Sequence, residues 1–186
     1  METHDFKDGN GPVPAHRHIN PDGSVGGWVA ETASVSVTAY VWTSAWVYGS
    51  AWVSGNAWVS GSAQVFGNAR VANNAQVFDN AWVSGSAQVF DNAQVFSSAR
   101  VSGKACVFGS AQVFGNARVA DNAQVFDNAR VFDKARVFGN AWVSGKAWVF
   151  SSAQVSGSAR VSGNAWVSGS ARVSGKTVVF DEVLFY

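Results

Sequence analysis

A six-residue motif that repeats without interruption occupies most of this chain. It reads Ala-x-Val-x followed by a turn-forming pair, as in residues 63–68 and 165–170. Copies begin at every sixth residue from Gly27 to Ala171, which makes 25 copies without insertion or deletion. Only the first copy lacks Ala at its first position, and every third position is Val. Self-similarity at a fixed short period is typical of solenoids, whose units stack along one axis.

Within each copy, Ala and Val alternate with variable residues. This alternation places Ala and Val on one face of a strand and the variable residues on the other. Small and medium side chains suit the inside of a narrow tube. The fifth and sixth positions hold mostly Gly or Asp and then Asn or Ser, residues that form turns and tolerate positive φ. Each copy is therefore predicted to be one short strand and one bend; the apolar period of two excludes a helix.

The repeat resembles that of left-handed parallel β-helices such as the hexapeptide acyltransferases, in which a small residue follows an aliphatic residue by four positions. Val65 and Ala69 have this spacing, as do Val113 and Ala117, and the resemblance covers about four-fifths of the chain. In that family three hexads form one triangular coil of 18 residues. The resemblance implies an all-β, left-handed parallel β-helix (β-solenoid) of about nine coils over residues 27–186, roughly 43 Å long at about 4.8 Å per coil.

The two ends of the chain differ from the repeat. Residues 1–26 are non-repetitive and rich in turn-forming residues, and we expect them to form an N-terminal arm or cap over the first coil. Residues 177–186 are expected to form an apolar terminal coil. If the six-residue phase continues to the last residue, Val183 and Phe185 take the Ala and Val positions inside the tube.

Three hexads per coil place every third copy on the same face, so the variable residues form ladders. A first face carries Arg100, Arg118 and Arg136 in consecutive coils. Another face carries a column of phenylalanines at the position after Val: Phe78, Phe96, Phe114, Phe132 and Phe150. Like residues stack well within one molecule, which is one explanation of these columns. The other is that the phenylalanine column is a lateral interface with a partner.

The repeat lacks the residue types that the resembled enzymes use. Hexapeptide acyltransferases need a catalytic His beside the coils, and the γ-class carbonic anhydrases hold zinc with His from neighbouring coils. No His lies in residues 27–186, since all three, His4, His16 and His18, precede the repeat. The alternating pair His16 and His18 lacks a third metal ligand, and Cys106 lacks a neighbouring His that would activate it. We expect a non-catalytic relative of these proteins, with no enzymatic activity, metal or cofactor.

Composition limits the classes of partner that we expect, but it does not indicate the cellular compartment. A net charge of +1 favours neither nucleic acid nor an anionic membrane surface. No apolar run is long enough to span a membrane, and residues 1–8 lack the features of a secretory signal. A cytoplasmic protein, a virion-associated protein and a protein exported by a route other than Sec are all consistent with this sequence.

Two functions fit these observations. The first is a structural rod, of bacterial or phage type, that self-assembles head to tail into a filament or fibre, with the arm strapping across the joint. The interface candidates are Ile19, Val25, Trp28, Val183, Leu184, Phe185 and Tyr186. The second is a carbohydrate- or protein-binding module that uses exposed Trp and Phe ladders. A side-by-side trimer through the phenylalanine column and a rod plugged by its own arm and tail are further alternatives.

Overall fold

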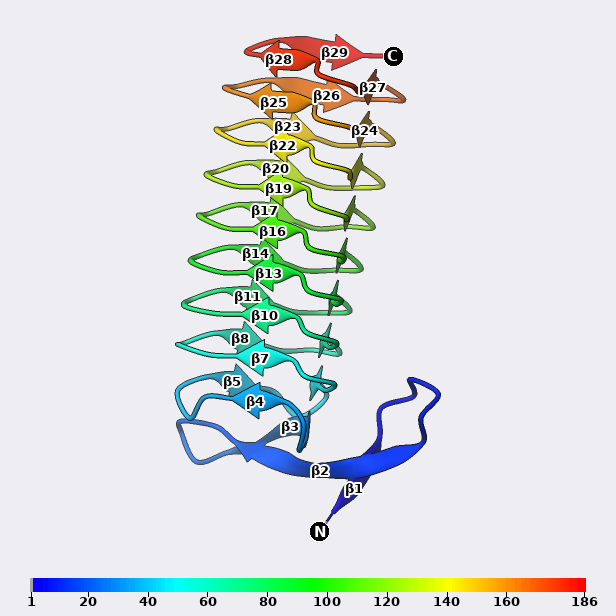
Figure 1. The fold of residues 1–186 in the computed structure, drawn as a ribbon. Coiled ribbons are helices and arrows are strands. Elements are labelled where there is room, and N and C mark those ends of the chain that lie inside the picture. The colour runs from blue at the N-terminus through cyan, green and yellow to red at the C-terminus, as the bar shows by residue number, and fades with distance from the viewer. Residues whose placement is uncertain (1) are drawn as a thin grey trace.

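The computed structural model describes residues 2–186, which form a three-sided β-solenoid of about nine turns with an 18-residue period (Figure 1). Three sheets, one on each side, run along the rod. Sheet 1 contains, in spatial order, β1 (Thr3–Asp5), β2 (Pro12–Ile19), β3 (Val25–Ala30), β6 (Trp46–Val47), β9 (Gln64–Val65), β12 (Trp82–Val83), β15 (Arg100–Val101), β18 (Arg118–Val119), β21 (Arg136–Val137), β24 (Gln154–Val155) and β27 (Arg172–Val173).

Sheets 2 and 3 contain nine strands each. Sheet 2 runs β4 (Ser34–Val35), β7 (Trp52–Val53), β10 (Arg70–Val71), β13 (Gln88–Val89), β16 (Cys106–Val107), β19 (Gln124–Val125), β22 (Trp142–Val143), β25 (Arg160–Ser162) and β28 (Val178–Phe180). Sheet 3 runs β5 (Tyr40–Val41), β8 (Trp58–Val59), β11 (Gln76–Val77), β14 (Gln94–Val95), β17 (Gln112–Val113), β20 (Arg130–Val131), β23 (Trp148–Val149), β26 (Trp166–Ser168) and β29 (Val183–Phe185). No helix that could cross a membrane occurs among residues 2–186.

The strands of neighbouring coils pair in parallel, one coil of 18 residues apart. Val101 lies opposite Val119, and that strand continues the ladder to Val137. The N–H groups of outward residues donate to the carbonyls of the next coil, as from Gln112 to Ala129 O at 2.9 Å. The predicted all-β triangular fold with three hexads per coil is confirmed; its left-handed sense stays a prediction from the resemblance.

The core is a continuous column of Ala and Val. From Ala39 to Val167, every Ala and Val at the first and third positions of the repeat is no more than 1% exposed. The tube is so narrow that nothing larger is needed to fill it, and each coil contributes three Ala and three Val. The prediction that these residues face inward is confirmed.

The bends explain why the fifth position alternates among Gly, Asp and a few polar residues. From Gly49 onward the chain turns there with positive φ, for example +69° at Gly109 and +59° at Asp127. At several bends the Asp side chain adds a hydrogen bond to the next coil. Asp127 Oδ2 accepts from the Gly145 N–H at 3.0 Å, and Asp91 Oδ2 accepts from the Gly109 N–H at 3.3 Å. Asp thus tolerates the left-handed conformation and caps a backbone donor of the adjacent bend.

The N-terminal residues fold back onto their own first coil. Strands β1 and β2 pair antiparallel, and β2 pairs antiparallel with β3, so this hairpin extends sheet 1 below the coils (Figure 1). The end of β2 and the residue that follows it lie against β5 and the residue before it. His18 Nε2 lies 2.9 Å from Ala39 O, and Asn20 Oδ1 accepts from the Val41 N–H at 2.9 Å. Residues 2–26 therefore cap this molecule's own coil, and they do not extend away from the rod as a strap would.

The last coil is one residue shorter than the repeat predicts. Val183 pairs with Trp166, Leu184 with Val167 and Phe185 with Ser168, an offset of 17 residues. The expectation that Val183 and Phe185 point inward is therefore wrong. The turn at Asp181 saves one residue, because Glu182 O occupies the place of an Ala carbonyl and accepts from the Trp166 N–H at 2.8 Å. Leu184 consequently packs against the core and closes this end of the tube.

Candidate functional surfaces

The phenylalanine column of sheet 3 is stacked and half-buried. The rings of Phe78, Phe96, Phe114, Phe132 and Phe150 lie parallel, with centroids 4.7–5.0 Å apart from one coil to the next. The three inner rings have a phenylalanine on both sides, Phe78 and Phe150 have one on a single side, and none of the five is among the exposed large side chains. This arrangement accounts for the column by stacking within the molecule. A lateral interface through this column stays a prediction. The half-buried rings leave little aromatic surface for a partner to contact.

Tryptophan supplies the exposed aromatic surface along the sides of the rod. Six of the nine tryptophans are 37–49% exposed: Trp42, Trp52, Trp58, Trp82, Trp142 and Trp166. Several have an arginine of the neighbouring coil stacked over one face, as Arg100 does on Trp82 at 4.6 Å and Arg160 on Trp142 at 4.5 Å. Such cation–π contacts hold the guanidinium groups in place. The solenoid is thus a repeat protein with exposed aromatic ladders.

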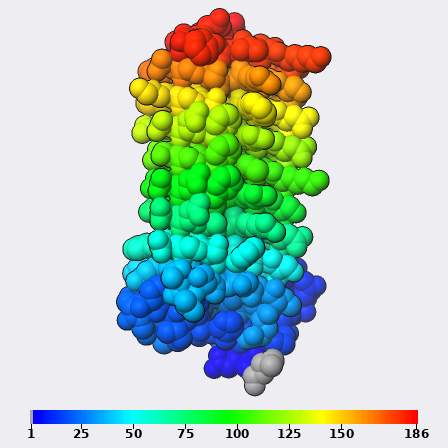
Figure 2. Space-filling model, turned by 60° about the vertical axis from the view of Figure 1, so that its left-hand side comes forward, coloured from blue at the N-terminus to red at the C-terminus, as the bar shows by residue number. Residues whose placement is uncertain are grey.

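The other exposed large apolar side chains gather at the two ends of the rod, which lie far apart in Figure 2. At the N-terminal end they are Ile19, Val25 and Val37, which are 58–80% exposed. At the C-terminal end they are Val178, Phe180, Val183, Phe185 and Tyr186, which are 54–82% exposed. Between Val37 and Val178, the exposed large apolar side chains are all tryptophans. Five of the seven candidate assembly residues are therefore accessible.

The two remaining candidates are partly covered by their own chain. Trp28 stacks on His4 with centroids 4.6 Å apart, and Arg17 lies 4.5 Å from its ring centroid. Leu184 packs against the core of the last coil. The N-terminal hairpin folds back over Trp28 and the short last turn directs Leu184 inward, so both are less exposed than the other five candidates. Their place in an assembly interface stays a prediction.

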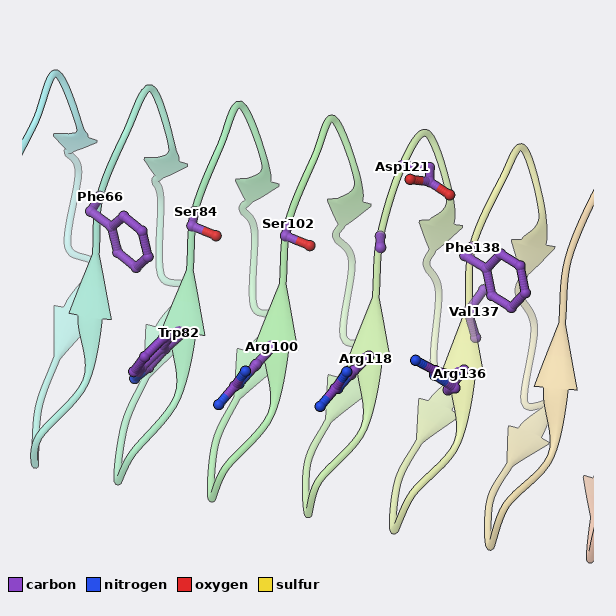
Figure 3. A pocket seen from close by; sticks show the side chains of 11 residues that line it. Phe66, Trp82, Ser84, Arg100, Ser102, Arg118, Asp121, Arg136, Val137 and Phe138 are labelled. Atoms are coloured by element: carbon purple, nitrogen blue, oxygen red, sulfur yellow. The ribbon is translucent and has the colours of Figure 1, made fainter. Parts of the chain in front are cut away.

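Sheet 1 carries a trough of about 520 Å³ beside its arginine ladder (Figure 3). Arg100, Arg118 and Arg136 project from consecutive coils in one row, and Trp82 precedes them in the same row. In the adjacent row, at the position after Val, the side chains are small in the middle and large at both ends. It reads Phe66, Ser84, Ser102, Ala120 and Phe138.

The arginine ladder has no carboxylate partner. Among residues 2–186 the ion pairs are Lys7 with Asp5 and His16 with Glu31, both in the N-terminal region. Asp121 lines the trough, but its Oδ2 accepts from the Gly139 N–H at 3.0 Å. Two unit charges one coil apart, about 4.8 Å, repel by about 0.9 kcal/mol even in bulk water. The sequence predicted the ladder; the trough beside it was missed, although small residues between two phenylalanines in the 18-residue column were the available signal.

His16 and His18 lie apart within β2 of sheet 1, and Cys106 lies in β16 of sheet 2. A register shift within β2, between Arg17 and Ile19, separates His16 from His18. His16 Nδ1 lies 2.8 Å from Glu31 Oε1 at the surface, whereas His18 is buried against Ala39 O. No group of three potential metal ligands occurs within the described residues. Burial raises the pKa of the Cys106 thiol, which disfavours the nucleophilic thiolate.

Comparison with known families agrees with this architecture. Residues 63–77, 75–89, 111–125, 123–137 and 153–169 match the YdcK beta solenoid repeat. These segments cover less than half of the chain, and there the chain is similar to the YdcK beta solenoid repeat. All five matches lie in the stacked coils, and none reaches the N-terminal hairpin. A comparison with curated proteins gave no match.

Proposed function

We propose that this protein is a non-enzymatic structural rod that associates head to tail with copies of itself. The observation that carries the proposal is the distribution of exposed aliphatic, phenylalanine and tyrosine side chains, which occupy only the two ends. Contiguous exposed apolar surface on a soluble protein marks an interaction site. Here the surface is divided between opposite ends of a column, which suits contacts made along its axis.

The last coil offers the surface that a further coil covers elsewhere in the rod. Phe180 is 60% exposed, whereas every phenylalanine at the equivalent position of the inner coils is partly buried. Strands β27, β28 and β29 are the final members of their sheets. Edge strands present unpaired N–H and C=O groups, which favour pairing with another strand. A second molecule stacked on this coil would satisfy those groups and bury Phe180, Val183 and Phe185.

The opposite end is only partly covered by the N-terminal hairpin. Ala33, just before β4, and Val35, in β4, pack against the core but are only partly buried, unlike their equivalents in later coils. Val37 is 80% exposed. Strands β4 and β28 are opposite edges of sheet 2. Head-to-tail stacking therefore extends this sheet in parallel, as the coils do internally. Contacts of this kind do not close on themselves, and their product is an open filament.

The absence of catalytic chemistry from the coils supports a structural role. Residues 27–186 contain no His, and the repeat has no inserted loop that could shape a substrate cleft. Each of the three histidines contacts the N-terminal hairpin or the first coils, as His4 does by stacking on Trp28. We therefore propose that the protein works by binding and assembly.

Light scattering coupled to size-exclusion chromatography tests the proposal. The wild-type protein is expected to run as species larger than the 19.6 kDa monomer, with a mass that rises with concentration. The double change Val183→Ser and Phe185→Ser should give monomers with unchanged circular dichroism, because both side chains lie outside the core. A matched lateral control, Phe96→Ser, should leave the assembly intact. A wild-type protein that stays at 19.6 kDa at high concentration, or an assembly that only Phe96→Ser disrupts, would refute axial association.

A second candidate function is binding of carbohydrate or protein through aromatic side chains. The observation in its favour is an exposed cluster on sheet 3, where Tyr40 and Trp42 lie 5.0 and 6.3 Å from Trp58. Flat aromatic surface of this kind stacks against sugar rings. Neutral oligosaccharides should then quench tryptophan fluorescence, and Trp58→Ala should abolish the response while Trp142→Ala should not. Equal responses in both variants would exclude this cluster.

A further inference from the structure

We propose that the trough on sheet 1 is a binding site for a short acidic oligosaccharide, whose carboxylate or sulfate groups pair with Arg100, Arg118 and Arg136. This site is on the side of the rod, so it is independent of the end-to-end contacts. The arginines are aligned and lack partners, and the shape of the trough and the mixture of groups that line it suit such a ligand.

The arginines form a row of fixed spacing. Arg100 is paired in register with Arg118, and Arg118 with Arg136. Trp82 precedes Arg100 in this row, and Arg100 stacks on it at 4.6 Å; all three arginine side chains are exposed. In Figure 3 the side chains of this row extend alongside one another from successive coils. The ladder thus presents three guanidinium groups, about one coil spacing of 4.8 Å apart, to a ligand that lies along the rod.

The positive charge of this row favours an anionic ligand, because the described chain provides no anionic partner for it. No carboxylate lies within 4 Å of these guanidinium groups in the described chain, and the nearby Asp121 is engaged with the Gly139 N–H. Guanidinium groups bind carboxylates and sulfates through two parallel hydrogen bonds, which makes arginine well suited to such ligands. An elongated anion would remove the repulsion between adjacent arginines.

The trough limits the ligand to a short segment. Phe66 and Phe138 stand at its two ends, four coils apart, and about 19 Å of rod therefore separates them. Between them Ser84, Ser102 and Ala120 leave the space that phenylalanines fill in the column of sheet 3. The serine hydroxyls can donate and accept hydrogen bonds, and the phenyl rings offer apolar surface. Hydroxyl groups, apolar ring faces and anionic groups together are the chemistry of an acidic sugar chain.

Two other polyanions fit the trough less well. An extended acidic peptide places side chains of one face about 6.6 Å apart, which does not match a ladder of about 4.8 Å. Single-stranded nucleic acid binds by stacking its bases on exposed aromatic faces. Here the ring of Trp82 already has Arg100 over one face and Phe66 in an edge contact at 6.0 Å. Both polymers serve as competitors in the test.

Calorimetry with a galacturonate trimer tests the site, with the neutral galactose trimer as the matched ligand. The acidic trimer should bind, its affinity should fall steeply between about 0.05 and 0.5 M NaCl, and the neutral trimer should not bind. Arg118→Gln should weaken binding by roughly tenfold, the loss of one charge-assisted hydrogen-bonding pair. Glutamine already occupies this column at Gln64 and Gln154, so the fold accommodates it.

Two further variants separate the site from general charge. Arg160→Gln removes an exposed guanidinium on sheet 2, which stacks on Trp142 as Arg100 does on Trp82, and should leave binding unchanged within twofold. Ser102→Phe keeps all three arginines but fills the trough with a side chain that other columns accept at this position, and should abolish binding. Equal losses in Arg118→Gln and Arg160→Gln, full binding by Ser102→Phe, no binding of the acidic trimer, or tighter binding of oligoglutamate or single-stranded DNA would each overturn the proposal.

Discussion

The inward orientation of Val can be tested with one substitution and its neighbour. Val113 lies in β17 with no exposed surface, surrounded by the Ala and Val of adjacent coils. Val113→Asp loses the burial of a Val side chain, worth about 1.5–3 kcal/mol. It also places an unpaired carboxylate in a dry core, which costs several kcal/mol more, or forces that carboxylate to be protonated. The expected loss is at least about 4 kcal/mol, since no polar group lines the tube at that level.

The same change at the preceding residue provides the control. Gln112 points outward, and its Nε2 donates to Gln94 Oε1 at 3.0 Å. Gln112→Asp removes that hydrogen bond, a net cost of about 0.5–1.5 kcal/mol, and places a carboxylate opposite Arg130 of the next coil. Guanidinium unfolding followed by circular dichroism should show a large shift for Val113→Asp and a small one for Gln112→Asp. Equal shifts, or a smaller shift for Val113→Asp, would refute the assignment of the two faces.

Three further predictions concern the columns, the bends and the cap. Phe114→Ser should destabilise the rod by about 2–4 kcal/mol in the same unfolding assay, because it removes a half-buried ring and two stacking contacts at 4.8 and 4.9 Å; a change below about 0.5 kcal/mol would show that the column contributes little. Gly61→Ala should cost roughly 1–3 kcal/mol more than Gly175→Ala, since both have positive φ but only the first would place a Cβ 2.8 Å from backbone atoms of the next bend; equal effects would contradict the close approach of the bends. Burial, with a further contribution from the charge of Arg17, lowers the pKa of His4 below 6.5. The unfolded chain therefore binds the proton more readily, and the contribution of His4 to stability is complete above pH 6.5 and is lost as the pH falls below it. His4→Phe should flatten the pH dependence of thermal unfolding in that range, and an unchanged pH dependence would exclude this role.

The fold could be predicted from the repeat because each hexad specifies its own strand and its own bend. Ala63 and Val65 fix the inner face, and the Gly-Asn pair that follows fixes the bend, so stacking needs no information from distant residues. The ladders followed from the period alone once three hexads were assigned to a coil. That number came from the resemblance to a known family, because a six-residue unit does not itself specify how many copies close a turn.

The ends were harder to predict because the repeat no longer determines them. At the C-terminal end the sequence stays in phase, yet the chain omits one residue after Asp181 and directs Leu184 inward. A pattern of alternating apolar residues cannot reveal such a register change, since Val183, Leu184 and Phe185 are all apolar. At the N-terminal end the antiparallel hairpin depends on contacts such as that of His18 with the first coil, which no local pattern encodes.

The trough on sheet 1 was also difficult to predict from the sequence. The alternation of phenylalanine with small residues at the position after Val is visible in the sequence. Its meaning depends on the neighbouring column, where Arg118 has neither a carboxylate nor an aromatic ring within contact distance. A binding site of this type is defined by two ladders side by side.

Mixing two end variants tests axial association most directly. One variant carries Val183→Ser and Phe185→Ser and keeps its N-terminal end; the other carries Ile19→Ser and Val25→Ser and keeps its C-terminal end. If the contact is head to tail, each variant alone is a 19.6 kDa monomer, and an equimolar mixture forms a dimer of about twice that mass that grows no further. Analytical ultracentrifugation of the separate and mixed samples measures this. A mixture that remains monomeric while the wild type assembles, or dimers formed by either variant alone, would contradict head-to-tail assembly.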